Sequence, residues 1–256
     1  GSSICMRSTI PRRSMMNQSG VAQAMRSLGH GGALLAFFEP LFEFNDVVDQ
    51  LVQFDVDSTF IQQEAIELLA AKAGVFDQVS KVTESAMRGE LDFAQSLIAR
   101  VALLKDLPES VIAEVQQEIL LTDGAAELVE KLHAKGHFVS LVSGGFINII
   151  KPLIDQLKID FYKANTLEIS DGRLTGRVTG LIIDRAAKAD ALHEFANKCG
   201  VKIEDTVAIG DGANDLDMMA AAGISIAFNA KPIVAAQAQF VINEPSLQGV
   251  AHLIKL

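Results

Sequence analysis

The sequence predicts an α/β fold: a Rossmann-like, mostly parallel sheet flanked by helices, with a small helical domain inserted after the first core strand. From Leu121 onward, short apolar segments alternate with segments of helical spacing, and this pattern favours β-α-β units. Residues 62–120 instead show helical spacing throughout, over a length that does not fit a simple crossover. With 49% hydrophobic residues in a chain of 256, enough apolar side chains exist for a substantial core.

Residues 1–48 are expected to form an N-terminal tail followed by a short helix near Ala33 to Val48. The first three residues, Gly1 to Ser3, resemble a cloning remnant. The stretch from Met6 to Gly32 is rich in Arg, Ser and Met, and no acidic residue precedes Glu39. Transit peptides, remnants of accessory domains and poorly ordered tails share this composition, and we favour a tail.

The first strand is predicted at Leu51, Val52 and Phe54, because buried parallel strands are almost continuously apolar. We expect a core of residues 49–61 and 121–256, with residues 62–120 forming a helical cap domain beside it. Glycines and a proline divide the cap into short helices. The apolar positions at helical intervals are Ile66, Leu69, Ala70, Val101, Leu104, Val111, Val115 and Ile119, and the interruptions are Gly74, Gly89 and Pro108.

After the cap, turn residues separate each predicted element from the next. The first predicted helix runs from Asp123-Gly124 to Lys135, and the second follows Phe146 and ends at Leu157. The third runs from Lys188 to Cys199, and the fourth follows the turn Gly210 to Asp215 and ends at Ala222. The predicted strands are His137 to Val142, Phe161 to Ala164, Thr206 to Ile209, Ser225 to Phe228 and Phe240 to Ile242. Asp171-Gly172 predicts a tight hairpin turn between Leu167–Ile169 and Leu174–Val178.

Composition excludes several classes of partner. The formal net charge of −10 is a poor match for nucleic acid or an anionic membrane. Apolar runs such as Gly32 to Phe38 are too short to span a bilayer. The two cysteines, Cys5 and Cys199, lie far apart and favour a reducing compartment. We expect a cytoplasmic protein, present as a single chain or a homodimer.

Two aspartates follow the first strand. Asp55 and Asp57 are two residues apart, so in an extended segment their side chains share one side at the carboxyl edge of the sheet. Open α/β sheets bind ligands at that edge. Two close carboxylates imply a divalent cation, a raised pKa, or both. The alternative is a turn in which Asp57 caps the helix near Phe60.

Three further segments are expected at the same edge. Ser143-Gly144-Gly145 would offer a hydroxyl and unobstructed amides at a helix start as an anion cradle, the alternative being a glycine turn with a serine cap. Lys188 would pair with a phosphate, unless it is an ordinary surface lysine. Asp211 and Asp215, with flanking glycines, suit magnesium better than a simple helix cap.

FDVDST, SGG, a lone lysine and GDGAND, in this order and spacing, resemble the four signatures of the haloacid dehalogenase superfamily of phosphohydrolases. The resemblance covers about residues 50–250 and implies a HAD-like core. Residues in the predicted cap narrow this resemblance to the members of the superfamily that act on O-phosphoserine. The matching positions are Glu64, the run TESAMRGELDF from Thr83 to Phe93, and Arg100 in LIARV.

By this resemblance, Asp55 is the nucleophile that becomes an aspartyl phosphate, and Asp57 is the acid and then the base. A positioned acid is required because an alkoxide is a poor leaving group. Ser143, the amide of Gly144 and Lys188 would hold the phosphoryl oxygens, and Asn214 would order that corner. A magnesium ion would be bound by the carboxylates of Asp55 and Asp211 and the backbone carbonyl of Asp57, with Asp215 supporting it or its waters.

The resemblance also implies how the substrate is chosen. Glu64 would bind the ammonium of O-phosphoserine, and Arg100 would bind its carboxylate. Met87 and Phe93 would exclude water when the cap closes, the alternative being that they are core residues. The implied reaction is the last step of serine biosynthesis. Alternatives are another small phosphate, such as phosphohomoserine or phosphothreonine, and a non-catalytic sensor. Residues 1–48 do not resemble the regulatory region of longer relatives, so the resemblance does not imply feedback through such a domain.

Overall fold

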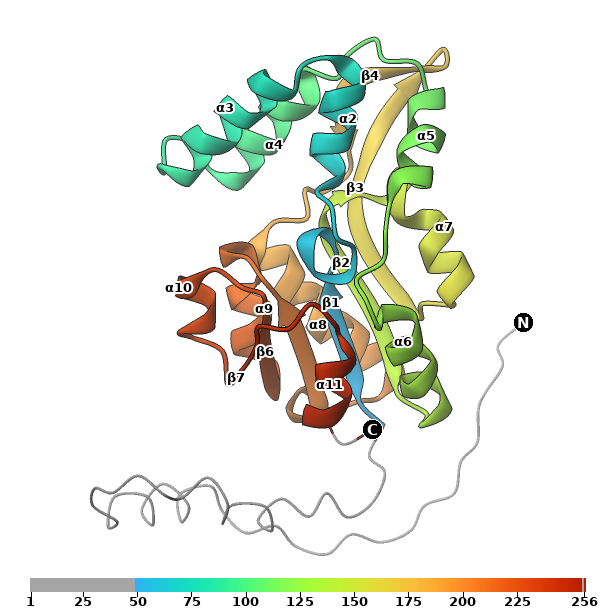
Figure 1. Ribbon diagram of the computed structural model, residues 1–256, viewed down its shortest axis with the longest axis vertical. Helices are drawn as coiled ribbons and strands as arrows, with labels where there is room; N and C mark the ends of the chain where they lie inside the picture. The colour runs from blue at the N-terminus through green and yellow to red at the C-terminus, as the bar shows by residue number, and fades with distance from the viewer. Residues whose placement is uncertain (1–48, 255) are drawn as a thin grey trace, which may run out of the picture. The chain divides into compact units, whose positions relative to one another are not determined.

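A computed structural model of the protein describes residues 49–254 and 256. The tail and short helix expected in residues 1–48 lie outside the described residues. The described part contains a seven-stranded sheet with the order β4-β3-β2-β1-β5-β6-β7 (Figure 1). Its strands are β1 Leu51–Asp55, β2 Phe138–Phe146, β3 Phe161–Ser170, β4 Arg173–Thr179, β5 Thr206–Gly210, β6 Ile224–Phe228 and β7 Phe240–Ile242.

The sheet is parallel except for β3 and β4, which form an antiparallel hairpin. In the centre, Asp55 of β1 is in register with Val142 of β2, and Phe54 with Ile209 of β5. The carboxyl ends of these strands therefore meet at one edge. The predicted mostly parallel sheet is confirmed.

Helices cover both faces of this sheet, and the alternation of side chains along β1 shows which lies where. Val52 and Phe54 belong to the large apolar cluster that includes α6 and α7, whereas Leu51 packs with Leu192 of α8 on the other face. Asp55 lies four residues after Leu51, so the two side chains are on the same face of the sheet and that of Asp55 points toward α8. The helices of the core are α6 Ala125–Ala134, α7 Ile147–Leu157, α8 Arg185–Cys199, α9 Leu216–Ala221, α10 Pro232–Ala235 and α11 Gln248–Leu253.

Four α-helices lie between β1 and α6. The apolar positions predicted from helical spacing are buried, apart from Ile119, which is partly buried against the core. Helix α4 begins with a capping box in which Asp92 accepts from the amide of Gln95. The helices are α2 Ala65–Ala73, α3 Phe76–Met87, α4 Phe93–Ala102 and α5 Ser110–Glu118, called the insertion helices below.

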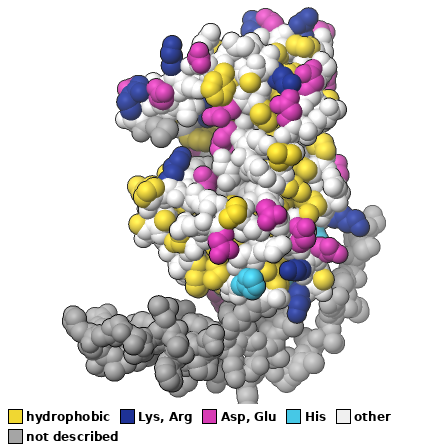
Figure 2. All heavy atoms as spheres, in the orientation of Figure 1, with side chains coloured by type: hydrophobic (Ala, Val, Ile, Leu, Met, Phe, Trp, Pro, Cys, Tyr) yellow, Lys and Arg dark blue, Asp and Glu magenta, His cyan; other side chains and the backbone are white. Residues whose placement is uncertain are grey.

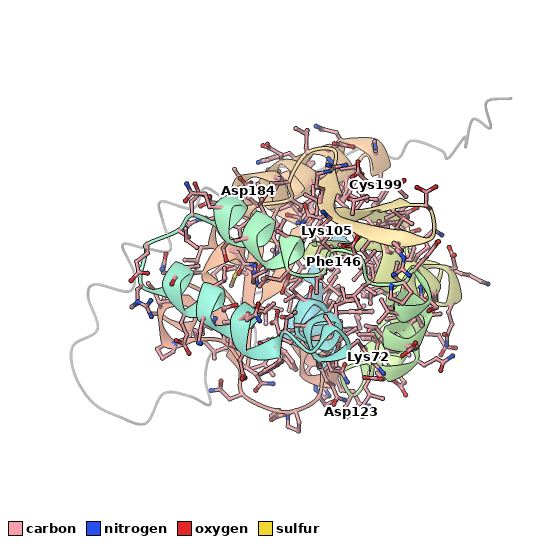
Figure 3. The ribbon with its side chains drawn as sticks, turned by 90° about the horizontal axis from the view of Figure 1, so that it is seen from above. Lys72, Lys105, Asp123, Phe146, Asp184 and Cys199 are labelled. Carbon is pink, nitrogen blue, oxygen red and sulfur yellow. The ribbon has the colours of Figure 1, made fainter. Side chains whose placement is uncertain are left out.

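The β3–β4 hairpin supports the insertion helices. The turn is Asp171-Gly172, as predicted, with φ of 51° and 70°. The amide of Asp106 donates to the carbonyl of Leu174 at 2.9 Å, so the segment between α4 and α5 pairs with β4. Lys105, labelled in Figure 3, lies beside Gly176 of the same strand. The hairpin and the insertion helices are therefore joined by backbone hydrogen bonds.

Two of the predicted boundaries that differ from the structure concern β2 and β3. β3 is one continuous strand rather than a short strand followed by half of a hairpin. The strand β2 runs through Ser143, Gly144 and Gly145, and α7 begins only at Ile147. The placement of Ser143 and Gly144 at a helix start was therefore wrong. The side-chain Nδ2 of Asn165 on β3 donates to the carbonyl of Gly144 at 2.8 Å and holds this segment extended.

None of the helices in the described part of the chain is long and apolar enough to cross a membrane.

Candidate active site

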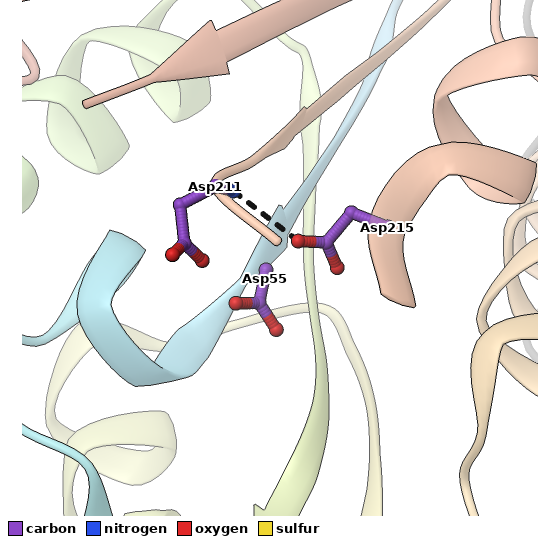
Figure 4. A group of neighbouring side chains, drawn as sticks. All are labelled: Asp55, Asp211 and Asp215. Carbon is purple, nitrogen blue, oxygen red and sulfur yellow. Dashed lines mark hydrogen bonds between the residues drawn. The ribbon is translucent and has the colours of Figure 1, made fainter. Parts of the chain in front are cut away.

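The carboxyl ends of β1 and β5 bring three aspartates together. Asp55 ends β1, and Asp211 follows β5 directly. Asp215 lies four residues further on, in the short helical turn before α9. Each residue contributes one carboxylate oxygen to a set whose members lie within 4.8 Å of one another (Figure 4). Three clustered carboxylate oxygens suit a hard divalent cation, so the donor chemistry of this acidic cluster fits a metal site.

Backbone amides fix Asp215 within this cluster. Its Oδ2 accepts from the amides of Gly212 and Asp211, at 3.0 and 3.2 Å. Gly210 leaves the space that Asp215 occupies, because a Cβ atom there would lie 2.5 Å from the Asp215 carboxyl carbon. The glycines of this motif are thus needed for close approach, and Asp215 is completely buried.

Lys188 of α8 neutralises part of the acidic cluster. Its ammonium donates to Oδ1 of Asp215 at 2.7 Å and also to Oδ1 of Asp55. Burial alone would lower the pKa of Lys188, but the charges of Asp215 and Asp55 outweigh it and raise that pKa. Lys188 is fully buried, so the surface-lysine alternative is excluded.

Burial dominates the electrostatics of the other cluster members. It raises the pKa of Asp55 well above its ordinary value, and the negative charge of Asp215 adds to the effect. The same two causes raise the pKa of Asp211 to about 6. A divalent cation at this point would oppose both shifts, because positive charge favours the ionised carboxylates.

Asp57 lies outside the acidic cluster and faces β2. Its Oδ2 accepts from the hydroxyl of Ser143 at 2.7 Å, and its Oδ1 accepts from the amide of Ala65 at 2.8 Å. The second contact satisfies an amide in the first turn of α2, so part of the helix-cap alternative holds, but for α2 rather than for a helix near Phe60. A Cβ atom on Gly145 would lie 2.6 Å from Asp57 Oδ2. The strand after Ser143 therefore requires glycine at this position.

Ser143 and Gly144 meet different partners. The hydroxyl of Ser143, besides donating to Asp57, accepts from the amide of Gly145 at 2.7 Å. Gly144 faces the insertion helices: a Cβ atom there would lie 2.7 Å from Cζ of Phe93, the first residue of α4. Phe93 thus packs directly on the backbone of β2.

Glu64 and Arg100 bring opposite charges to the same cavity. Glu64 precedes α2, and its Oε1 accepts from the hydroxyl of Ser58 at 2.8 Å. Burial, followed by repulsion from Asp57, raises the pKa of Glu64 to about 7. Arg100 lies in the last turn of α4, where burial lowers its pKa and Glu64 opposes that effect.

These residues surround a cavity of about 450 Å³ between the insertion helices and the strand ends. Its wall contains most of the predicted site residues: Asp55, Asp57, Glu64, Phe93, Arg100, Gly144, Asp211 and Asn214. Ser143, Lys188 and Asp215 are buried and reach the site through their contacts with the wall residues. Met87 belongs to α3, but its side chain lies outside what the structure describes.

Two charged residues of the cavity wall were not predicted as site residues. Arg185, at the first position of α8, and Lys231, before α10, both line the cavity. Sequence signals existed for each, because Arg185 follows the helix-capping Asp184 and Lys231 lies just beyond β6. Neither belongs to an acidic or glycine-rich motif, so spacing alone did not separate them from surface residues.

The comparisons with known proteins agree with this architecture. Residues 52–220 match the family model for haloacid dehalogenase-like hydrolases. The chain therefore belongs to the haloacid dehalogenase-like hydrolases, an enzyme family, and the resemblance noted from its motifs is confirmed. Phosphatases of this family are generally metal-dependent, in keeping with the acidic cluster.

Within the family, two similar relatives carry the same name. A phosphoserine phosphatase of Streptomyces coelicolor is 57% identical over 80% of this chain and 50% of its own length. A phosphoserine phosphatase of Streptococcus thermophilus is 49% identical over 81% of this chain and 96% of its own length. The chain thus spans about half the length of some of the curated relatives it matches and nearly all of others.

Solved structures show the same fold. A substrate-bound phosphoserine phosphatase complex is 41% identical, with a TM-score of 0.77 over 80% of this chain and 98% of that one. A structure described as a phospho-aspartyl intermediate analogue of phosphoserine phosphatase has a TM-score of 0.76 at 41% identity and the same coverage.

Proposed function

We propose that this protein is a Mg²⁺-dependent phosphatase that hydrolyses O-phosphoserine to serine and phosphate. One observation carries the proposal: Asp55, Asp57, Glu64 and Arg100 face a single cavity, with Lys188 bonded to Asp55 directly behind its wall. Lys188, together with a cation held by the carboxylates near β1, would neutralise the charge of a phosphoryl group. Glu64 and Arg100 suit the two charged groups of an amino acid.

The proposed reaction has two steps. A carboxylate oxygen of Asp55 attacks phosphorus while the bond from phosphorus to the serine oxygen breaks, and Asp57 gives its proton to that oxygen. Water then attacks the aspartyl phosphate and gives a proton to Asp57, and the bond between Asp55 and phosphorus breaks. Inorganic phosphate leaves, and both aspartates return to their initial states.

The surroundings of Asp55 and Asp57 support these roles. Asp57 accepts from Ser143 and Ala65, two contacts that orient its carboxyl group beside the cavity. Lys188 and the Gly144 backbone would bind the phosphoryl oxygens, and Asn214 would order the wall next to them. Mg²⁺, when bound by Asp55, Asp211 and Asp215, would neutralise charge on the phosphoryl group. A backbone ligand from Asp57 is part of the same proposal.

The proposed domain organisation follows from this chemistry. Residues 62–120 act as a cap over a core of residues 49–61 and 121–256, and Met87 and Phe93 of the cap exclude water from the closed site.

We propose that the enzyme works in the cytoplasm, where its reaction is the last step of serine synthesis. A homodimer is the alternative to a single chain, and light scattering distinguishes the two.

The test is phosphate release from O-phosphoserine, phosphohomoserine, phosphothreonine and p-nitrophenyl phosphate in the presence of Mg²⁺. We expect the highest kcat/KM for O-phosphoserine, and no turnover by Asp55→Asn. Preference for another ester would contradict the substrate. Full activity of Asp55→Asn would contradict the covalent mechanism, and phosphoserine binding without turnover by the wild type would indicate a sensor.

A further inference from the structure

The cavity wall is more acidic than an anionic substrate requires. Four carboxylates face it, Asp55, Asp57, Glu64 and Asp211, against three cations. The whole chain carries a formal charge of −10. The chain as a whole therefore repels an anionic phosphate ester, so positive charge at the cavity opening would favour its approach.

Two of the three cations lie on the exposed part of the wall. Arg100 of α4 is only partly exposed, whereas Lys231 is exposed, and 48% of the Arg185 side chain is exposed. Figure 2 shows a hollow beneath the insertion helices, with a basic side chain on its α10 side. Both Lys231 and Arg185 thus reach the cavity and the solvent.

The backbone fixes Lys231 independently of its side chain. Its amide donates to the carbonyl of Asp211 at 3.1 Å, which ties the start of α10 to the acidic cluster. Within residues 49–254 and 256, no carboxylate forms an ion pair with its ammonium, which leaves that charge available to a ligand.

Arg185 differs because its charge is partly neutralised. Its guanidinium donates to Oδ1 of Asp217, the second residue of α9. The Asp217 side chain in this ion pair is 42% exposed. Asp217 is absent from the cavity wall. It therefore weakens the positive field at the opening without contacting the cavity itself.

We infer that Lys231 and Arg185 form an electrostatic entrance that draws the anionic substrate into the cavity, and that Asp217 sets the strength of its field. The inference rests on the proposed phosphatase function. It assigns the two cations to capture of the substrate rather than to the chemical step, so their effects belong in kcat/KM and depend on salt.

The test compares Lys231→Gln, Asp217→Asn and a matched control, Lys202→Gln. Lys202 is an exposed lysine before β5, at the opposite end of that strand from Asp211, so its substitution changes the net charge equally without changing the opening. Steady-state kinetics with O-phosphoserine and Mg²⁺ are measured at ionic strengths of about 0.02 M and about 0.3 M, which bracket strong and weak screening.

At low ionic strength we expect Lys231→Gln to lower kcat/KM about threefold and Asp217→Asn to raise it about twofold, relative to wild type. Both differences should shrink to less than about 1.5-fold at high ionic strength, with kcat within about twofold throughout. Lys202→Gln should follow the wild type. Arg185→Gln provides a second variant, expected to lower kcat/KM less than Lys231→Gln because Asp217 already offsets its charge.

An equal effect of Lys202→Gln, a salt-independent loss in Lys231→Gln, or a loss instead of a gain in Asp217→Asn would overturn the inference. Its failure is distinct from failure of the proposed function. Wild-type turnover of O-phosphoserine reports the function, whereas the ratio between low and high ionic strength reports the entrance. If another phosphate ester is the better substrate, the same salt series with that ester tests the entrance directly.

Discussion

The ammonium of Lys188 lies 2.7 Å from Oδ1 of Asp215, and both side chains are completely buried. α8 and the turn before α9 meet through this pair, behind the carboxylate of Asp55. Removing either partner of such a buried ion pair leaves an uncompensated charge in the interior, and that charge destabilises the folded state. The same contact therefore connects the stability of the fold with the electrostatics of the site.

Lys188→Met is expected to reduce the free energy of unfolding by about 3–5 kcal/mol, because Asp55 and Asp215 lose their cation. Urea denaturation in the presence of EDTA measures this. Lys198→Met is the control, since Lys198 lies on the same helix in an exposed pair with Glu194 and should change stability by less than about 1 kcal/mol. Equal losses in the two variants would contradict the role given to Lys188.

Removal of divalent metal is expected to abolish phosphate release and to lower the thermal midpoint. Metal bound only to the folded state stabilises it, by about 2.7 kcal/mol at a hundredfold excess over Kd. Asp211→Asn should abolish the Mg²⁺-dependent shift in the midpoint. Asp171→Asn, in the hairpin turn, should retain it. A shift that persists in Asp211→Asn would place the metal elsewhere.

Glu64 predicts a pH dependence of stability. Its pKa in the folded protein is about 7 against an ordinary value of 4.5, so the folded state favours the protonated form. The free energy of unfolding should therefore fall as pH rises from about 4.5 to about 7, by roughly 2 kcal/mol from this group. Glu64→Gln keeps the oxygen that accepts from Ser58 and removes the charge.

The check is urea denaturation of wild type and Glu64→Gln at pH 4.5 and pH 8. The variant should be the more stable protein at pH 8, and the two should be similar at pH 4.5. A constant difference across this range would contradict the raised pKa.

Gly144→Ala is expected to displace Phe93, because the added methyl group would lie 2.7 Å from its ring. The cost should be on the order of 1–3 kcal/mol and should shrink in a Phe93→Ala background, where the ring is absent. A double-mutant cycle by urea denaturation measures the coupling. Gly249→Ala in α11 is the control, since the nearest atom to its added methyl group is 3.4 Å away. Additive effects would show that the two residues do not interact.

Arg100→Ala is expected to impair recognition of the substrate carboxylate. kcat/KM for O-phosphoserine should fall at least tenfold, while that for O-phosphoethanolamine, which lacks the carboxylate, should change less than threefold. Parallel kinetics with the two esters measure this difference. A uniform loss with both esters would assign Arg100 to the architecture of the cavity rather than to selectivity.

Sequence patterns predicted the elements whose conformation depends mainly on neighbouring residues in the chain. The apolar run at Leu51 and the Asp171-Gly172 turn predicted β1 and the hairpin, because strand burial and positive φ depend on neighbouring residues. The end of β2 was missed because its extension past Val142 depends on Asn165, which lies on the adjacent strand and donates to Gly144. Long-range hydrogen bonds of this kind leave no periodic signal in the sequence.

The sequence by itself determined the family, the order of most strands and helices along the chain, and the acidic and glycine-rich motifs, because hydrophobic periodicity and motif spacing are properties of the chain. Only the tertiary structure decided that Lys188 is fully buried against Asp55 and Asp215, that Asp57 bonds to Ser143 rather than joining the acidic cluster, and that Lys231 and Arg185 reach the cavity. These relationships join residues far apart in the chain, and their pKa values and partners depend on burial and distance, which exist only after the strands have packed together.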